Sequence, residues 1–541
     1  MSVARSSMLM ASGTIISRVL GFARTILLAA AIGVTTDAAD AFGVANQLPN
    51  NVYAIIVTGL LNAVLIPQIV KARSNKDGGK GYVDRLLTLI LTVFLTVTLI
   101  ATIAAPALVS LYTSGWNEQQ LALASAFAYW CLPQLFFYGL YSLLGEVLNS
   151  RSVFGPYMWA PVLNNVVAMV GLVAFIVIFG ADPNGARSVS AWSESEIALL
   201  SGGATLGVAA QAFILLVAWR REGIKFTPNF KWRGFGLRPA LKAASWSLGM
   251  VVVTQVAGVV QTIVASGAIT ARALNPNIAS VAAAGVAWLI FMVPHSVVTV
   301  SVATAYFTKM AQHAHDKNMP ALRNDFSAGL RAISVFAVFF SIAMSVLAYP
   351  MANVFIGDFG AAVSLGNVLV AFMVGLLPFS FVYMMQRAFY SLEDTRTPFV
   401  FTLIQTIMYI IGAAVIAMTV PAEWIVVALS LLTSGTVTIQ AIIAFTMLTK
   451  RIGALGDHKV ATALAQFILA GLLAGAVGVA AIEMIGGINA DSFAMASVLS
   501  SALTLALVGF LMFAVYSIAL RLLKVPEIDA AISGLKGILR R

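Results

Sequence analysis

Two arginines inside an apolar stretch are the residues of this sequence best suited to bind an anion. The apolar stretch at residues 12–33 is long enough to cross a bilayer as a helix, yet it includes Arg18 and Arg24. Each arginine near the centre of a span costs about 2.5 to 3.5 kcal/mol. Guanidinium groups form strong bidentate hydrogen bonds with phosphate oxygens. We therefore predict that both bind a diphosphate in a water-containing cavity. The alternative is a structural pair that bonds helix-end carbonyls or reaches the membrane surface.

Polar side chains at a similar depth open the second apolar stretch. They are Asn46, Gln47 and Asn50, and Pro49 among them removes one backbone donor and frees a carbonyl. Polar groups at that depth are tolerated only against protein or water. We predict that the three side chains line the cavity of the arginines, and the alternative is hydrogen bonding between helices.

The composition places these residues in a polytopic membrane protein. Of 541 residues, 60% are hydrophobic and only 10% are charged, and the mean hydropathy is +0.94. Soluble domains carry about 25% charged residues. Fourteen stretches are long enough to span a bilayer, and the first is the only one with charged residues in its interior. The expected fold is all-α with fourteen transmembrane helices.

The basic residues set the expected orientation. Outside the first span, only Arg187 and Arg272 fall on one side of the predicted membrane, and all other lysines and arginines fall on the opposite side. The positive-inside rule therefore places both termini in the cytoplasm. The net charge of +11 fits this topology and contact with anionic lipid heads, and nothing indicates nucleic acid.

A repeat relates two parts of the chain. Residues 17–26 align with residues 254–263, where Gln255 and Gln261 replace the two arginines. The repeat indicates two six-helix lobes related by an axis along the membrane normal, and both glutamines are expected to line the cavity. The predicted divisions are residues 1–220 (first lobe), 221–237 (basic cytoplasmic linker), 238–450 (second lobe) and 451–541 (two further helices and a cytoplasmic C-terminus).

Charged side chains at the ends of the predicted spans indicate gates. Asp40 either caps the second helix or pairs with Arg24 as a gate. His295, beside Pro294, could switch its protonation state, although a buried neutral histidine is the favoured interpretation. The residues predicted to form a gating network at the cytoplasmic rim are Glu146, Arg151, Arg387, Glu393, Asp394 and Arg396.

Four motifs of the sequence are specific: SRVLGFAR at 17–24, ADAF with QLPN at 39–50, VPHSVVTVSVATAYFTKMA at 293–311 and AFYSLEDTRTP at 388–398. Together they resemble the MurJ (MviN) family, the lipid II flippases of the multidrug/oligosaccharidyl-lipid/polysaccharide (MOP) exporter superfamily. The resemblance implies two six-helix lobes around a central cavity, with the last two helices lining a groove for a lipid tail. Arg18 and Arg24 match the family's cavity arginines, and Asp40 and Asn50 match its polar positions.

The implied substrate is lipid II, the undecaprenyl-diphosphate-linked disaccharide pentapeptide, flipped outward across the bacterial cytoplasmic membrane. Membrane lipids and cell-wall synthesis proteins are the expected partners, and the expected protein is a transporter without a cofactor. Cys131 has no second ligand for a metal. The membrane potential would favour outward movement of an anionic head by about 2.3 kcal/mol per charge per 100 mV.

The chain departs from the family at several positions. Thr25 stands where relatives often carry Asp, and Trp288 and Leu289 stand where they carry an arginine near an acid. No carboxylate marks a sodium site in the seventh, eleventh or twelfth predicted helix. The alternatives are a flippase for another polyprenyl-diphosphate glycan, a cation-coupled drug exporter of the same superfamily, and a membrane glycosyltransferase that uses Asp37 and Asp40.

Overall fold

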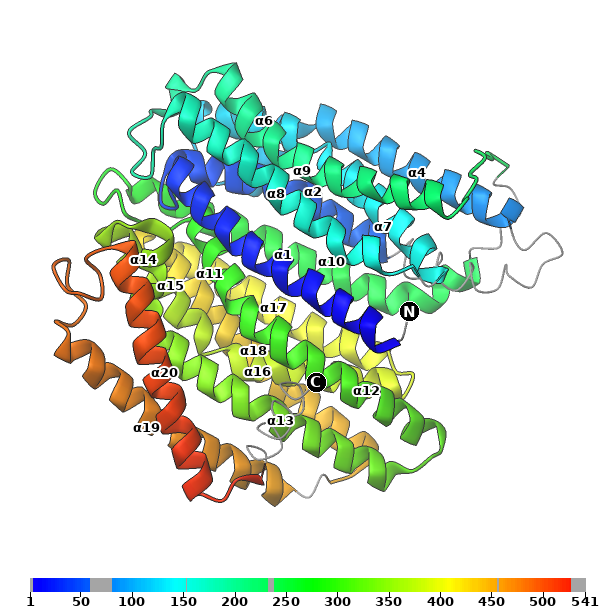
Figure 1. The fold of residues 1–541 in the computed structure, drawn as a ribbon, viewed down its shortest axis with the longest axis vertical. Coiled ribbons are helices and arrows are strands. Elements are labelled where there is room, and N and C mark those ends of the chain that lie inside the picture. Colours follow the sequence, from blue (N-terminus) through cyan, green and yellow to red (C-terminus); the bar gives the residue numbers. More distant parts are fainter. Residues whose placement is uncertain (1–2, 59–79, 152, 232–237, 455–456, 527–541) are drawn as a thin grey trace. The chain divides into compact units, whose positions relative to one another are not determined.

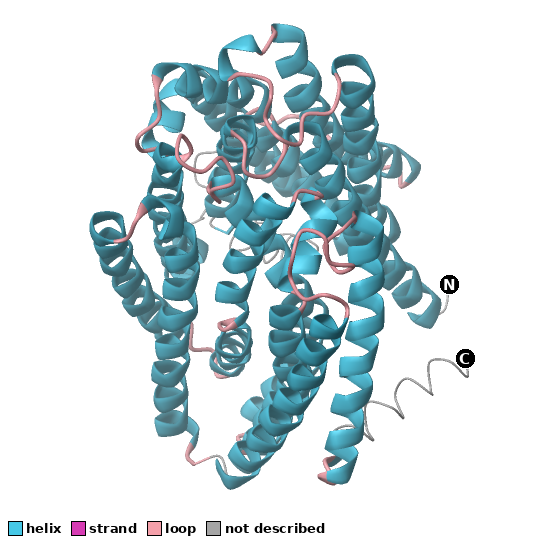
Figure 2. Cartoon of the chain, turned by 90° about the vertical axis from the view of Figure 1, so that its left-hand side faces the viewer, coloured by secondary structure: helices cyan, strands magenta, loops and turns pink. Residues whose placement is uncertain are grey.

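The computed structural model describes residues 3–58, 80–151, 153–231, 238–454 and 457–526. Within these ranges the chain consists of helices and loops, without a strand (Figure 2). Twelve described helices are long and apolar enough to cross a membrane, or thirteen if one bent pair counts as a single span. The prediction of an all-helical, multi-pass membrane protein is confirmed. The predicted second span extends into residues 59–70, which lie outside the described ranges, so the count of fourteen stays a prediction.

The chain divides into two compact units, Met1–Thr270 and Ala271–Arg541, which are described separately. In the first unit, α8 packs on α9 and on α1, while α2 packs on α6, α7 and α10 (Figure 1). Its α-helices are α1 (Val3–Ile32), α2 (Asp37–Ile56), α4 (Lys80–Ile103), α5 (Ala105–Tyr112), α6 (Glu118–Cys131), α7 (Gln134–Ser150), α8 (Gly155–Phe179), α9 (Glu194–Arg221) and α10 (Arg238–Ser266).

Local chemistry explains where these helices begin and end. Gly33 has φ +80° and ends α1, a conformation that glycine adopts without a steric penalty. Thr36 then caps α2, because its side chain accepts a hydrogen bond of 3.0 Å from the Ala39 amide. Pro133 lies in the short break between α6 and α7. A buried core of this unit is made by aliphatic and aromatic side chains of α4, α7, α8 and α9, among them the fully buried Phe94.

The second unit contains a further series of helices. α19 and α20 pack on each other, and they contact α13 and α14 respectively. Its helices are α11 (Val281–Pro294), the π-helical turn η4 (His295–Thr299), α12 (Val300–His315), α13 (Met319–Val346), α14 (Ala348–Ile356), α15 (Phe359–Met373), α16 (Leu376–Ser391), α17 (Arg396–Thr419), α18 (Ile425–Ile452), α19 (Asp457–Met484) and α20 (Val498–Leu522).

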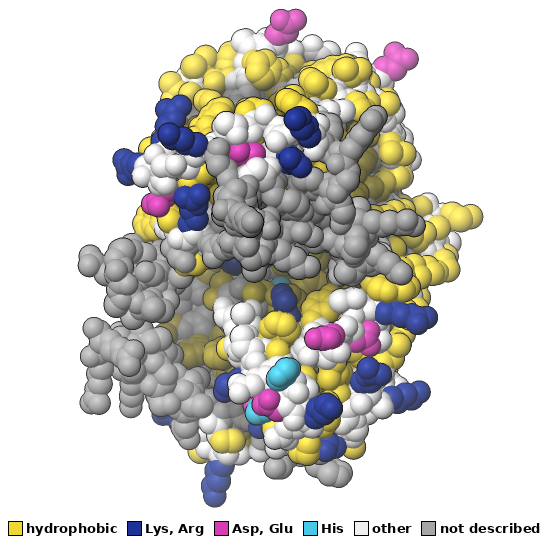
Figure 3. Space-filling view, turned by 90° about the vertical axis from the view of Figure 1, so that its right-hand side faces the viewer, with side chains coloured by type: hydrophobic (Ala, Val, Ile, Leu, Met, Phe, Trp, Pro, Cys, Tyr) yellow, Lys and Arg dark blue, Asp and Glu magenta, His cyan; other side chains and the backbone are white. Residues whose placement is uncertain are grey.

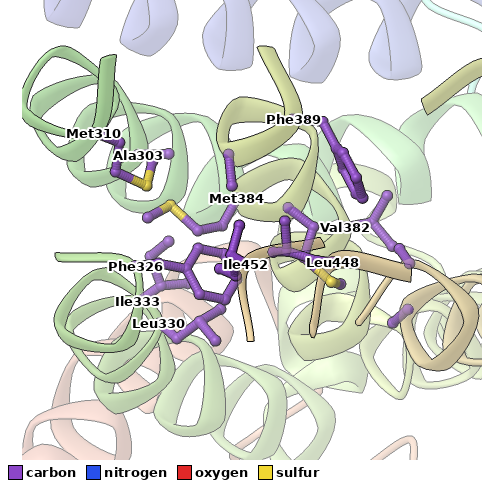
Figure 4. Packing of buried hydrophobic residues seen from close by; sticks show 14 of the residues in the cluster. Ala303, Met310, Phe326, Leu330, Ile333, Val382, Met384, Phe389, Leu448 and Ile452 are labelled. Carbon is purple, nitrogen blue, oxygen red and sulfur yellow. The ribbon is translucent and has the colours of Figure 1, made fainter. Parts of the chain in front are cut away.

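Phenylalanine, leucine and methionine side chains of α12, α13, α16, α17 and α18 fill the core of this unit (Figure 4). Phe326 and Met384 are fully buried there. Beside this core, α15 and α16 meet at an angle of 44°. The Ser434 hydroxyl of α18 donates a 2.8 Å hydrogen bond to the Ala371 carbonyl oxygen at this bend.

Large hydrophobic side chains are exposed on the surface of both units. Val177 is 77% exposed, Met418 85% and Phe510 73%. In the space-filling view, lysine and arginine side chains project from a surface on which hydrophobic side chains are prominent (Figure 3). Such an apolar surface suits contact with lipid chains.

The two units are defined by contacts in space, whereas the predicted lobes are defined by the sequence repeat. The repeat places α10 at the start of the second lobe, whereas α10 packs on α2 and α5 within the first unit. A contact unit groups neighbours in space, and a repeat groups similar sequences. The lobe boundaries therefore stay a prediction.

Candidate functional site

Both predicted cavity arginines lie on α1, within the membrane-crossing stretch Ser12–Ile32. Asn165 of α8 fixes this helix just before the first of them: its side-chain amide donates 2.8 Å to the Ser17 carbonyl oxygen and 3.3 Å to the Ser17 hydroxyl. One turn further on, a Cβ atom at Gly21 would meet only the Asn165 amide nitrogen, at 3.9 Å. The absence of a side chain at Gly21 keeps the helix surface open between the two arginines.

Arg24 is partly buried and has no acidic neighbour in the described part of the chain. It makes no hydrogen bond or ion pair with any residue that the structure describes. The groups with which it interacts electrostatically are Tyr138 and Cys131, of α7 and α6. Arg18 is also partly buried. Arg24, a cation inside a span without a carboxylate partner in the described ranges, is therefore a candidate to bind an anionic ligand.

Asn46 belongs to a hydrogen-bond network that joins four helices. Gln134, which is 1% exposed, donates 3.1 Å bonds to Asn46 Oδ1 and to Thr205 Oγ1. The Thr205 hydroxyl in turn donates to the Trp130 carbonyl oxygen at 2.7 Å. The Tyr138 hydroxyl donates to Gln134 Oε1 at 3.2 Å. Asn46 therefore supports the positions of α2, α6, α7 and α9.

Gln47 and Gln255 connect α2 with α10. The Thr262 hydroxyl donates to Gln47 Oε1 at 3.4 Å, and Gln255 Nε2 donates to the Asn51 carbonyl oxygen at 2.9 Å. Both glutamines thus make bonds within the first unit.

Asn50 and Gln261 complete the predicted polar set. Asn50 is exposed and Gln261 is partly buried. Neither makes a hydrogen bond with a residue in the described ranges. Their amide groups are therefore the members of the set best placed to bond a ligand.

The structure adds a line of polar residues that the sequence analysis missed. Gln134, Tyr138, Ser142 and Glu146 follow one another at intervals of four residues along α7, and we call them the α7 polar stripe. The Ser142 hydroxyl is hydrogen bonded to the Tyr53 hydroxyl of α2. A four-residue interval keeps side chains on one side of a helix, so this spacing was the available signal. Of the four, only Glu146 was predicted to be functional.

Asp40 is completely buried in the first turn of α2. The capping interpretation of Asp40 is wrong, since Thr36 is the N-cap residue of this helix. The gating role of Asp40 stays a prediction.

The predicted rim residues of the second unit cluster around the link between α16 and α17. Asp394 lies just before Thr395, the N-cap residue of α17, and its two carboxylate oxygens accept bonds of 2.9 and 2.7 Å from the Thr397 amide and hydroxyl. Glu393 is exposed in the turn, with φ +58°. Arg387 Nη2 donates to the Tyr383 hydroxyl at 2.6 Å, and the guanidinium carbon lies 5.7 Å from the Phe307 ring centroid.

The other predicted residues lie on several elements. Arg396 is exposed at the start of α17, and Arg151 is exposed at the end of α7 in the first unit. His295 is buried in the π-helical turn, where its Nδ1 lies 3.4 Å from the Ser380 hydroxyl. Its ring contacts Phe379 and Tyr383, with centroid distances of 4.6 and 5.3 Å. The predicted gating network stays a prediction.

Comparison with known proteins matches most of this chain to one family. The family model described as "Lipid II flippase MurJ" matches residues 28–515. The protein called "Probable lipid II flippase MurJ" of Haemophilus influenzae is 24% identical over 414 residues, covering 71% of this chain and 75% of the relative. That of Rhizobium tropici is 26% identical over 420 residues, covering 75% and 74%.

Solved structures share the fold. "Lipid II flippase MurJ, inward closed conformation" superimposes with a TM-score of 0.72 at 17% identity, covering 95% of this chain and 99% of that one. A structure described as the inward-facing conformation of a multidrug resistance MATE family transporter of the MOP superfamily has a TM-score of 0.62 at 18% identity, covering 83% and 99%. These likenesses establish the MOP-type fold.

Proposed function

Because this chain belongs to the MurJ family of lipid II flippases, we propose that it carries lipid II from the inner to the outer leaflet of the bacterial cytoplasmic membrane. The proposal depends on the environment of Arg24. This cation is partly buried in a membrane-crossing helix, and it makes no ion pair with a described residue. An anionic ligand would offset the cost of that charge. The protein acts as a transporter, without chemical conversion of its cargo.

Arg18 and Arg24 bind the diphosphate of the lipid. Each guanidinium presents a planar fork of donors that matches two phosphate oxygens. Such charge-assisted bonds are roughly twice as strong as neutral ones. Asn50 and Gln261 offer further amide donors, whereas Asn46, Gln47 and Gln255 hold the helices that frame the site.

Transport proceeds by alternating access in a fold of fourteen helices with both termini in the cytoplasm. Residues 1–220 and 238–450 form two lobes joined by the linker 221–237, and residues 451–541 add two helices that line a lipid groove. The lobes rock about the site. Asp40 gates one end, and Glu146, Arg151, Arg387, Glu393, Asp394 and Arg396 gate the cytoplasmic rim. Cell-wall synthesis proteins receive the product.

Two other cargoes remain alternatives. A different polyprenyl-diphosphate glycan carries the same diphosphate, so the arginines do not distinguish it from lipid II. The MATE-like fold is shared with multidrug exporters. A cationic drug, however, would be repelled by Arg18 and Arg24.

Complementation tests this function. A strain depleted of its own lipid II flippase should grow when it expresses the wild-type chain, and should fail with Arg24→Ala at equal membrane levels. Arg221→Ala is the matched control, because Arg221 is exposed at the end of α9. Normal growth with both Arg18→Ala and Arg24→Ala would contradict diphosphate binding. Failure of the wild-type chain, with correct insertion, would contradict lipid II as the cargo.

A further inference from the structure

Glu146 is the last residue of the α7 polar stripe, and three tyrosines lie around it. It interacts electrostatically with the hydroxyl groups of Tyr53 on α2, Tyr141 on α7 and Tyr157 on α8. The group therefore draws on three helices of the first unit. We call these four residues the Glu146 cluster.

Packing fixes the tyrosine rings of this cluster. The rings of Tyr141 and Tyr157 stack with centroids 4.8 Å apart and planes inclined by 15°. The Tyr141 hydroxyl donates a 3.0 Å bond to the Tyr157 carbonyl oxygen. A Cβ atom at Gly145 would come within 2.2 Å of the Tyr157 ring, so glycine at this position allows the ring to lie directly on α7. The cluster is thus built before any ligand arrives.

The Glu146 carboxylate makes no hydrogen bond or ion pair with any residue in the described ranges. It is partly buried within the apolar stretch Glu118–Asn149. Partial burial of an anion is unfavourable unless a cation or donors compensate it. The hydroxyl groups of Tyr53 and Tyr141 already have partners in Ser142 and in the Tyr157 carbonyl. Aromatic rings beside a carboxylate attract a cation through their negative faces.

We propose that the Glu146 cluster binds a monovalent cation, at a site separate from the diphosphate site. Arg24 interacts electrostatically with Tyr138, and Glu146 follows Tyr138 by eight residues, which is about 12 Å along the axis of α7. One ligand with a negative and a positive group can span that distance. The cation has two possible sources. One is an ammonium group of the lipid-linked peptide, which would occupy the cluster while the diphosphate binds Arg24; this source rests on the proposed function. The other is a free alkali ion.

The test uses the full chain in nanodiscs and two probes. The first probe is lipid II, either with a free peptide amine or with that amine acetylated. The second probe is NaCl or KCl in the absence of lipid II. Binding of the salt is measured by thermal unfolding and by tyrosine fluorescence. Glu146→Gln removes the charge with little change of shape. Glu222→Gln is the matched control, since Glu222 is exposed at the end of α9. Glu146→Asp keeps the charge and should retain part of the binding.

For an ammonium ligand, acetylation should weaken binding to the wild type by about tenfold and leave binding to Glu146→Gln unchanged. For an alkali ion, acetylation should have no effect, while the salt-dependent signal of the wild type should disappear in Glu146→Gln and persist in Glu222→Gln. Insensitivity of the wild type to both acetylation and alkali ions would overturn the site. Failure to bind lipid II at all would overturn the proposed function instead, and the lipid-free arm would still decide the cation site.

Discussion

Asn165 of α8 holds Ser17 of α1 through a 2.8 Å hydrogen bond to its carbonyl oxygen, directly before Arg18. The bond reaches α1 at the residue that precedes the arginine-bearing turn. It therefore sets the position of that turn against α8.

Replacing Asn165 with alanine should loosen α1 more than it destabilises the protein. Hydrogen bonds between membrane helices contribute on average about 0.6 kcal/mol. We expect faster hydrogen exchange around Gly21 and weaker lipid II binding, with a small change in thermal unfolding. Val166→Ala, at a 40% exposed neighbouring position, serves as the control. Unchanged exchange on α1 would show that this bond does not position the arginines.

Arg24→Lys should separate charge from geometry at the diphosphate site. Lysine keeps the positive charge but loses the bidentate fork. We expect binding of inorganic pyrophosphate and lipid II to rank wild type, then Arg24→Lys, then Arg24→Ala. With charged hydrogen bonds worth about 1.5 to 3 kcal/mol, the alanine variant should bind about ten- to a hundredfold more weakly. Equal affinities for all three, measured by calorimetry, would remove Arg24 from the site.

Gln134→Ala should destabilise the first unit. The substitution leaves Asn46, Thr205 and Tyr138 without one hydrogen-bond partner each. Fully buried unsatisfied polar groups cost about 1 to 3 kcal/mol each. These three groups are partly buried, so each should contribute at or below the lower value, and the unfolding temperature should fall. Gln119→Ala, at an exposed position on α6, is the control. A double-mutant cycle with Asn46→Ala should give a coupling of about 0.5 kcal/mol or more, and additivity would argue against the network.

Arg187→Ala should lower stability without a direct effect on cargo binding. Arg187 Nε lies 3.0 Å from Glu196 Oε1, Arg187 Nη2 donates to the Phe179 carbonyl oxygen at 2.9 Å, and the guanidinium carbon lies 5.1 Å from the Trp192 ring centroid. Removing one partner of a buried ion pair costs about 3 to 5 kcal/mol, and this pair, 15% and 10% exposed, should approach the lower value. Unfolding in detergent measures the loss, and lipid II affinity at low temperature should stay at the wild-type value.

Collapsing the membrane potential should slow flipping in proteoliposomes. The cell interior is negative, so an anionic head moving outward gains about 2.3 kcal/mol per charge per 100 mV. A potassium gradient with valinomycin sets the potential, and replacement of sodium by choline at unchanged potassium concentrations is the control. If the rate of flipping does not depend on the membrane potential and flipping stops when sodium is removed, the proposed driving force is wrong.

The sequence was sufficient for the fold class and for the membrane location of the two arginines. Composition requires membrane helices, and the motif around Arg18 and Arg24 indicated the family that the comparison confirms. The layout of two lobes and the gates are still predictions, because they depend on how distant segments meet.

Local patterns failed where partners come from other helices. The α7 polar stripe looked like a continuous apolar span, since Gln134 and Ser142 acquire their roles only from Asn46 and Tyr53 of α2. The sequence offers both Thr36 and Asp40 near the start of α2, and the structure shows that Thr36 is the cap, because its side chain accepts a hydrogen bond from the Ala39 amide. The hydrogen-bond partner of Gln255, the Asn51 carbonyl of α2, likewise could not be deduced from the repeat.

The bend between α15 and α16 has a consequence for the second unit in the bilayer. An interrupted span exposes backbone carbonyls that hydrocarbon cannot solvate. The Ser434 hydroxyl donates a hydrogen bond to the Ala371 carbonyl, so α18 supplies a donor for one carbonyl at the bend. This hydrogen bond links the bent pair α15 and α16 to α18. We therefore expect the three helices to move together when the second unit changes conformation.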